Sequence, residues 1–439
     1  MHGFYQKRKT DKLRQEKRDI KMKTGKKRSV CRIISFMMIF SLLSVYGCKE
    51  KKIEVVDYPE PTITEVTDNT QDAATQDEDT NSAMPSALDL EALKPEVNTL
   101  KEEGTFVYNA AVIPDWILKE FENNPKIVRI SKEILVAIDH AEEEYEFSSD
   151  LNLTEDELIQ VTLIISYSCP FYSQIIYEKA ENENVYTLRY FPNMEASDAE
   201  VSDADMIDTS AYGNKGYNMS DFASQEEAII IMDSYKDYVT ALINDNLNSE
   251  MSEREMAAVI YSELVRGASF SPENPDYYLG QGEESIDPES YFGRKAVDNI
   301  IDQKYTRGIE LLRTYQYIMN QLHIESRLVV GNGIFQDEVK EQFGEKYPTT
   351  PYWSWLSMQL DGEYFNCDII LEKLIHDFKF GDDTDVYPEM TYFGMSDDKR
   401  KESYKFMDTS IYLMDITDIN SEPPRPPKCP NNYEYHYFY

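Results

Sequence analysis

One acidic side chain, Asp368, stands at the end of a predicted β-hairpin and is the first candidate for chemistry. Residues 352–368 read YWSWLSMQLDGEYFNCD, in which two runs of strand-type residues flank Asp361-Gly362, a strong signal for a two-residue turn. A carboxylate orients the catalytic imidazole in many acyl-transfer sites. The chemistry open to this carboxylate therefore depends on which nucleophile and which base lie beside Asp368.

The predicted turn determines which side chains share a face of the hairpin. A two-residue turn pairs Leu360 with Glu363, so Asp368 lies opposite Trp355 and diagonal to Trp353. Diagonal neighbours on one face are about 7–8 Å apart, within reach of aromatic side chains. We therefore expect the two indoles and the carboxylate to line one face.

Cysteines and histidines supply few partners for this carboxylate. Cys367 adjoins Asp368 but must point to the opposite face because side chains alternate along a strand, and we expect it and Cys169 to be small buried hydrophobes. His376 is the only histidine close to Asp368 in sequence and is a candidate for a rebuilt acid-base role. No spacing matches a zinc site or a Ca²⁺ loop, so we expect neither a metal nor a cofactor.

The elements that position Asp368 follow from the sequence around it. Residues 308–322, GIELLRTYQYIMNQL, place their apolar side chains on one helical stripe, and residues 326–331, SRLVVG, are typical of a strand. The order helix, strand, loop and hairpin predicts an α+β fold in which a helix packs on a small antiparallel sheet.

A helical region with one hairpin is predicted upstream, over residues 105–250. The segments QIIYEKA and VYTLRYF alternate like paired strands. Helix starts are marked by capping boxes, in which a Ser or Thr precedes a Glu by three residues. The three boxes are Thr154/Glu157, Ser224/Glu227 and Ser252/Glu255.

The C-terminal region carries a family resemblance. The series ELLRTYQYIMNQLHIESRLVVG, YWSWLSMQLDGEYFNCD and YFGMSDDKRK resembles the transglutaminase-like family, whose core has a papain-like fold, and it places that domain at residues 251–439. In that family a Cys begins the long helix, a His lies in the first hairpin strand and an Asp in the second. The matching positions here are Gly308, Trp353 and Asp368.

The resemblance implies a vestigial triad. Gly308 offers no nucleophile, and the indole of Trp353 donates one hydrogen bond and accepts none, so it cannot act as a general base. Only Asp368 is kept. We expect no catalytic residues here, and we expect Trp353, Trp355 and Asp368 to line the former active-site groove as binding residues.

Charge is distributed unevenly along the 439 residues. The chain has 81 Asp and Glu against 44 Lys and Arg, for a net charge of −37. Residues 1–32 nevertheless carry a net charge of +10, so the chain from Cys48 onward carries −47. A surface this acidic repels phosphate backbones, and nucleic acid is excluded as a partner.

The basic start and the apolar run that follows it are typical of a secretory signal over residues 1–47. The uncharged run IISFMMIFSLLSVYG has 15 residues, fewer than the roughly 20 that a spanning helix needs. It ends in Gly47-Cys48, which resembles a bacterial lipobox and implies lipidation of Cys48. The alternative is an ordinary signal peptide in which Cys48 occurs by chance. The start of translation is a separate open question, with Met1 and Met22 as the two candidates.

A polar, acidic stretch follows the signal. Residues 48–104 contain DNTQDAATQDEDTNSAMPS and few apolar residues, which predicts a disordered tether. The expected localisation is the cell membrane, where the lipid anchor holds the chain on the extracellular face. Three cysteines remain after Cys31 and Cys48, so no disulfide framework is implied.

Two functions follow from these expectations. The first is a membrane-anchored extracellular lipoprotein whose inactive transglutaminase-like domain serves as a binding or scaffold module for a peptide, protein or cell-wall ligand. The alternative is a cell-surface cysteine-type peptidase or amide-transferring enzyme with relocated catalytic residues. The missing Cys and His favour the first.

Overall fold

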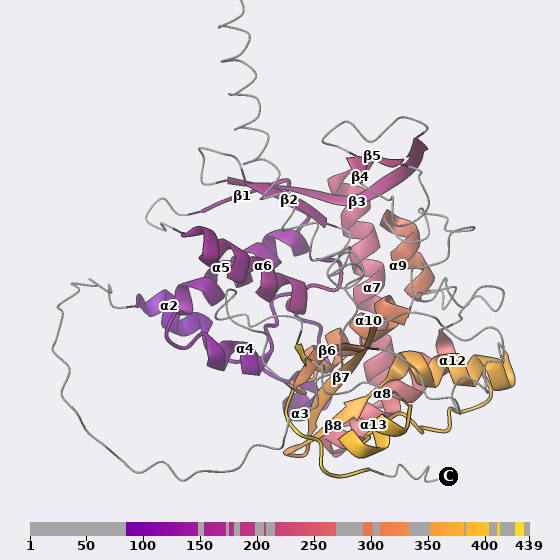
Figure 1. Cartoon of the computed structure of the whole chain (residues 1–439). Helices are drawn as coiled ribbons and strands as arrows, with labels where there is room; N and C mark the ends of the chain where they lie inside the picture. Colours follow the sequence, from indigo (N-terminus) through magenta and orange to yellow (C-terminus); the bar gives the residue numbers. More distant parts are fainter. Residues whose placement is uncertain are drawn as a thin grey trace, which may run out of the picture.

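The computed structural model combines helices with two antiparallel sheets, which confirms the α+β class (Figure 1). The predicted signal segment and Cys48 lie outside the described residues. The structure describes residues 85–147, 153–172, 175–179, 185–197, 206–207, 216–268, 293–301, 308–332, 352–381, 383–403, 411–412 and 426–433.

The predicted tether ends earlier than expected, because its last part contains two short helices. Helix α2 (Ala87–Ala92) begins with a capping box at Ser86, and α3 (Thr99–Glu103) is capped by Asn98. Leu100 of α3 is 1% exposed and anchors the segment in the core. The expectation of disorder up to residue 104 is thus wrong in this part, because local caps and one buried leucine outweigh a polar composition.

Three helices and the first sheet form the next layer. The sheet follows the order β1-β3-β5-β4, with β2 also paired to β3 (Figure 1). It contacts α5 through β1. The expected hairpin QIIYEKA–VYTLRYF is confirmed by the antiparallel pairing of β2 with β3. The elements are α4 (Asp115–Glu120), α5 (Pro125–Asp139), β1 (Glu144–Glu146), α6 (Glu155–Ser168), β2 (Ile175–Lys179), β3 (Val185–Ser197), β4 (Met206–Ile207) and β5 (Gly216–Ala223).

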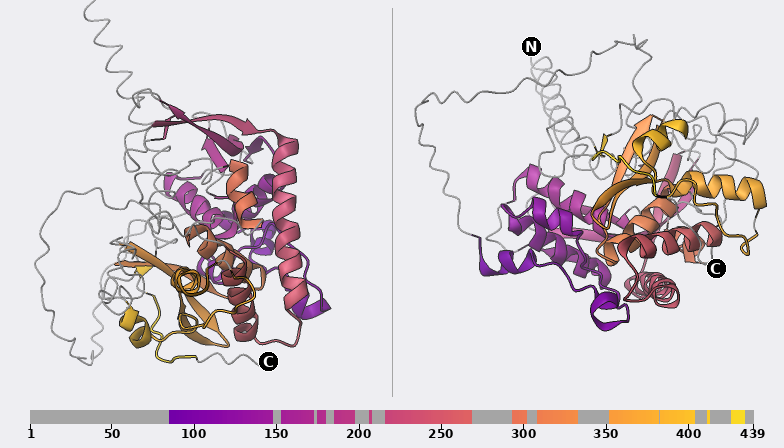
Figure 2. Two further views of the ribbon diagram at one scale, coloured as in Figure 1. Left: turned by 90° about the vertical axis from the view of Figure 1, so that its right-hand side faces the viewer. Right: turned by 90° about the horizontal axis from the view of Figure 1, so that it is seen from below.

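All three predicted capping boxes are confirmed. Thr154, Ser224 and Ser252 each accept a hydrogen bond from the backbone of the glutamate three residues on, and that glutamate in turn accepts one from the backbone of the capping residue. They begin α6, α7 (Gln225–Asn246) and α8 (Glu253–Gly267). Helix α7 runs from the first sheet towards α8 (Figure 2).

The second sheet has the order β8-β7-β6-β9, and Asp368 directly follows its strand β8. Helix α10 contacts β6 and β7, so the predicted packing of a helix on a small antiparallel sheet is confirmed. The remaining elements are α9 (Gly293–Ile301), α10 (Gly308–Gln321), β6 (Ser326–Asn332), β7 (Tyr352–Leu360), β8 (Glu363–Cys367), α12 (Ile369–Phe380), α13 (Asp397–Ser403) and β9 (Ile411–Tyr412).

The hairpin register agrees with the prediction. Asp361 and Gly362 have φ values of 53° and 86°, the two left-handed positions of a type I′ turn. Leu360 pairs with Glu363. The strands stay in register as far as Cys367, so the residues of the hairpin alternate between its two faces as expected.

The regions on either side of residue 250 share one hydrophobic core. Helix α10 makes the connection, because Asn320 donates a hydrogen bond of 2.8 Å to the carbonyl of Tyr167 in α6. Tyr317 of α10 is hydrogen-bonded through its hydroxyl to Tyr108. The predicted boundary between residues 250 and 251 is therefore not a break in packing.

Candidate functional site

Asp368 caps helix α12 and is completely buried. Its Oδ1 accepts the backbone N–H of Leu371 at 2.9 Å, and its Oδ2 accepts the indole Nε1–H of Trp353 at 2.6 Å. Its backbone is also held, because its N–H donates to Tyr392 and its carbonyl accepts the hydroxyl of Tyr261 at 2.9 Å. Both carboxylate oxygens are thus used within the fold.

Burial controls the protonation of this carboxyl group. Removal from water raises the pKa of Asp368 to about 7, although the hydrogen bonds from Leu371 and Trp353 and the positive charge of Arg400 oppose the shift. In the family arrangement the acid orients an imidazole. Here its donor is an indole, which keeps its proton and has no lone pair to offer.

The start of α10 packs against the start of α12, the helix that Asp368 caps. Gly308 is the first residue of the helix, and a Cβ built on it would lie 2.7 Å from Cγ2 of Ile370. Ile370 is two residues from Asp368 and is itself 4% exposed. The structure therefore brings Gly308, Trp353 and Asp368 into one neighbourhood, and a buried isoleucine fills the space that a side chain at position 308 needs.

Trp355 lies two residues beyond Trp353 in β7, on the same face of the hairpin. Its Nε1–H donates to Oδ1 of Asn366 at 2.9 Å, and the guanidinium carbon of Arg400 lies 3.9 Å from the ring centroid. Arg400 comes from α13 and is 3% exposed, and burial lowers its pKa to about 10. Trp353 and Trp355 are 2% and 1% exposed, so they do not present the ligand-binding surface that the sequence suggested.

The described cysteines carry no reactive thiolate. Cys169, Cys367 and Cys429 are free and buried. Burial raises the pKa of each thiol to about 12, so the thiolate fraction at neutral pH is negligible. Cys367 accepts the backbone N–H of Gly394 at its sulfur, on the face opposite Asp368, as expected from strand alternation.

His376 is a structural residue of α12. Its Nε2 lies 2.9 Å from the carbonyl oxygen of Val386, and because a carbonyl only accepts, Nε2 carries the proton. The ring is 3% exposed and packs on Phe380. These contacts give the histidine the role of holding the 383–396 loop. The rebuilt acid-base role stays a prediction.

Glu372 is a buried carboxyl group that the sequence reading missed. It is 2% exposed, its Oε2 accepts the backbone N–H of Tyr392 at 2.7 Å, and burial raises its pKa to about 7. Asp368, Glu372 and His376 are four residues apart along the sequence. Each of them is hydrogen-bonded to a residue of the 383–396 loop. An acidic residue within the apolar run IILEKLI was the available signal.

The described residues include no group of three or more His, Cys, Asp or Glu side chains placed to hold a metal ion. Among the same residues, no helix is both long enough and apolar enough to span a membrane. A comparison of the chain with protein-family models finds no match, and a comparison with curated protein sequences finds none either. The family resemblance therefore stays a prediction that depends on the spacing of the segments and on the hairpin pattern described in the sequence analysis.

Proposed function

We propose that this chain is a membrane-anchored extracellular lipoprotein whose C-terminal region is a transglutaminase-like domain of papain-like fold without the family's chemistry. The domain acts as a binding or scaffold module at the cell surface. One observation carries the proposal: Trp353 closes off Asp368, and Ile370, two residues further on, fills the side-chain space at Gly308.

The chemistry of the site supports this proposal. Thiol-dependent amide transfer needs a thiolate, a base that accepts its proton and a group that orients the base. The indole of Trp353 fills the base position as a donor, and the described thiols are buried and protonated. Loss of the nucleophile alone costs about as much as loss of the whole triad.

A turnover assay tests the proposed loss of chemistry. The full chain is incubated with a glutamine-containing peptide and a labelled amine, and separately with a peptide substrate for hydrolysis, each with and without iodoacetamide. We expect no turnover that iodoacetamide abolishes. Such turnover, lost in a Cys169→Ser, Cys367→Ser or Cys429→Ser variant, would support the alternative of a cysteine-type enzyme with relocated residues.

The proposed anchor has a separate test. Mass spectrometry of the N-terminal peptide from cells that export the protein should find a lipid-modified Cys48, and a Cys48→Ala variant should be released from the membrane fraction. An unmodified terminus, or equal retention of both proteins, would contradict the lipoprotein part of the proposal and leave the inactive domain in place.

A further inference from the structure

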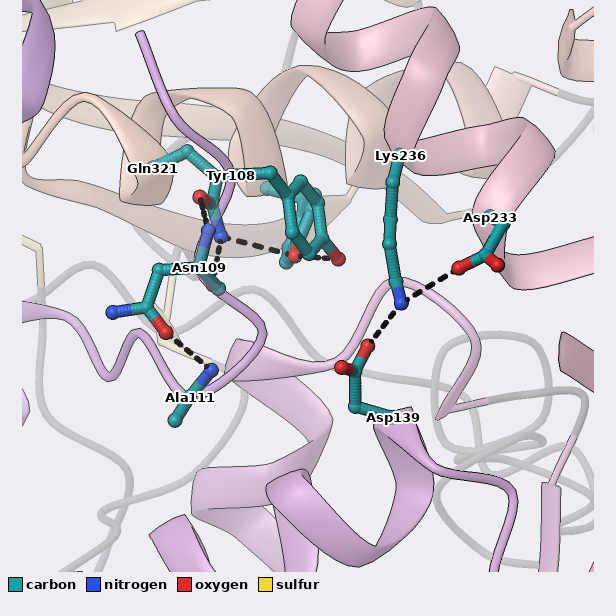
Figure 3. A network of polar contacts seen from close by, with 8 residues as sticks. Tyr108, Asn109, Ala111, Asp139, Asp233, Lys236 and Gln321 are labelled. Carbon is teal, nitrogen blue, oxygen red and sulfur yellow. Dashed lines mark hydrogen bonds and ion pairs between the residues drawn. The ribbon is translucent and has the colours of Figure 1, made fainter.

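Residues 105–111, here called the strap, cross from α3 to α4 and lie against α7 and α10. Residues 106–109 form neither helix nor strand. Figure 3 shows the part of the strap around Tyr108 and Asn109, with Gln321 of α10 and Lys236 of α7 facing it. The strap is therefore an irregular segment that two helices hold in place.

Two side-chain amides bind the backbone of the strap. Asn244 of α7 accepts the N–H of Phe106 at 2.8 Å and donates to its carbonyl at 3.0 Å. Gln321 of α10 accepts the N–H of Asn109 at 3.1 Å and donates to its carbonyl at 2.8 Å. Each amide thus satisfies both backbone groups of one residue, and those groups are present in any peptide.

The side chains of the strap give the contact its selectivity. Phe106 is 3% exposed and Val107 is 58% exposed, which is the alternation of an extended peptide on a surface. The hydroxyl of Tyr108 is hydrogen-bonded to that of Tyr317, whose hydroxyl also accepts Nε2 of Gln321 at 3.0 Å. The surface of the two helices thus contacts the side chain of a Phe, leaves the next residue exposed and contacts the side chain of a Tyr.

A fixed cation completes this surface. Nζ of Lys236 lies 6.0 Å from the ring centroid of Tyr108. It is held there by Asp139 at 2.6 Å and Asp233 at 3.0 Å (Figure 3). The charge is therefore positioned by α5 and α7 and does not depend on the strap.

We propose that this face of α7 and α10 is a binding site for an extended peptide of the pattern Phe-x-Tyr-x, which residues 106–109 occupy in cis. A segment of a partner protein binds by replacing the strap. The polar groups of Asn244, Tyr317 and Gln321 belong to the two helices and stay when the strap leaves. This peptide site rests on the proposed binding role of the protein, to which it adds a location and a class of partner.

A labelled peptide tests the proposal. The probe is a fluorescent peptide of residues 104–111, GTFVYNAA, and the receptor is the full chain carrying Phe106→Ala and Tyr108→Ala to weaken its own strap. We expect saturable binding, at least about 10-fold tighter than to the unaltered chain, because the competing strap is weakened. A peptide with both aromatic residues replaced by Ala should not bind.

Variants of the helix side chains locate the site. Adding Gln321→Ala to the weakened chain removes two hydrogen bonds and should weaken binding of the peptide about 10- to 100-fold. Asn246→Ala is the matched control, because the Asn246 side chain donates to Leu242 of its own helix, and it should leave binding unchanged. Equal loss in both variants, or no saturable binding to the folded receptor, would overturn the proposal.

Hydrogen exchange gives a second readout that does not need the strap variants to fold. In the unaltered chain, a saturating excess of the peptide should speed exchange of the Phe106 and Asn109 amides, while the alanine-substituted peptide leaves it unchanged. Unchanged exchange with both peptides contradicts the proposal. Thiol-dependent turnover would instead overturn the inactive-domain proposal and leave the peptide site standing, so the two failures are distinguishable.

Discussion

Substitution of Gly308 by alanine probes the closure of the expected nucleophile position. The added Cβ would lie 2.7 Å from Cγ2 of Ile370 and 3.4 Å from both its Cγ1 and its Cδ1. A branched methyl next to Cβ moves only if the whole side chain changes rotamer, and Ile370 is buried. The added methyl group therefore overpacks this part of the core.

The expected effect combines two opposing contributions. Overpacking of a core costs about 1–3 kcal/mol. Exchange of a helical glycine for alanine returns about 0.5–1 kcal/mol. Together these ranges give a net loss of up to about 2.5 kcal/mol in the free energy of unfolding, with a central value of about 1 kcal/mol, which is measurable as a lower urea midpoint of the full chain.

A double-mutant cycle identifies Ile370 as the cause. Ile370→Ala alone leaves a cavity and should cost about 2–5 kcal/mol. In the double variant the methyl group added at position 308 no longer meets Cγ2, so the combined loss should be at least about 1 kcal/mol smaller than the sum of the single losses. A neutral or stabilising Gly308→Ala, or strictly additive losses, would show that the space at position 308 is open and refute the reasoning.

Two further predictions concern the buried ionisable groups. Burial raises the pKa of Asp368 and Glu372 to about 7, whereas unfolded carboxyl groups titrate near pH 4, so the folded chain binds more protons between these values. The free energy of unfolding should rise as the pH falls from about 7 towards 4, by on the order of 3 kcal/mol per group. Asp368→Asn and Glu372→Gln should each remove the part of this rise that comes from the replaced carboxyl group. A pH profile that is unchanged in both variants would contradict this. Cys169, Cys367 and Cys429 should react with iodoacetamide only after unfolding, as measured by mass spectrometry of their peptides, and rapid labelling of any of them in the folded chain would contradict the burial described here.

Local signals were sufficient to predict the elements that hold the site. The Asp361-Gly362 turn determines the register of the hairpin, and the apolar stripe of residues 308–322 predicts α10. The capping boxes predict three helix starts correctly, because a cap is a contact between residues three apart in sequence. The end of the tether was mispredicted because this segment is held by contacts with residues far from it in sequence, such as the hydrogen bond from Asn98 to the carbonyl of Leu322.

The closure of the site could not be predicted, because it depends on contacts between distant segments. Ile370 meets Gly308 from another helix, and Arg400 reaches Trp355 from α13. The hairpin pattern placed Trp353 and Asp368 on one face. Whether solvent reaches that face depends on how the whole domain packs, which the pattern does not show. Nothing in the sequence indicates that Asn244 and Gln321 bind the backbone of the strap.

The state of the Trp353 indole tests the central claim most directly, since we hold that this indole closes off Asp368. The chain has three tryptophans, so its indole region contains few ¹H–¹⁵N signals, and the Trp353→Phe variant assigns the relevant one. We predict that the Nε1–H of Trp353 exchanges with solvent only slowly, because it is buried and donates to Asp368 at 2.6 Å. Exchange at the rate of a free indole would show an open site with an available carboxylate and would contradict the account.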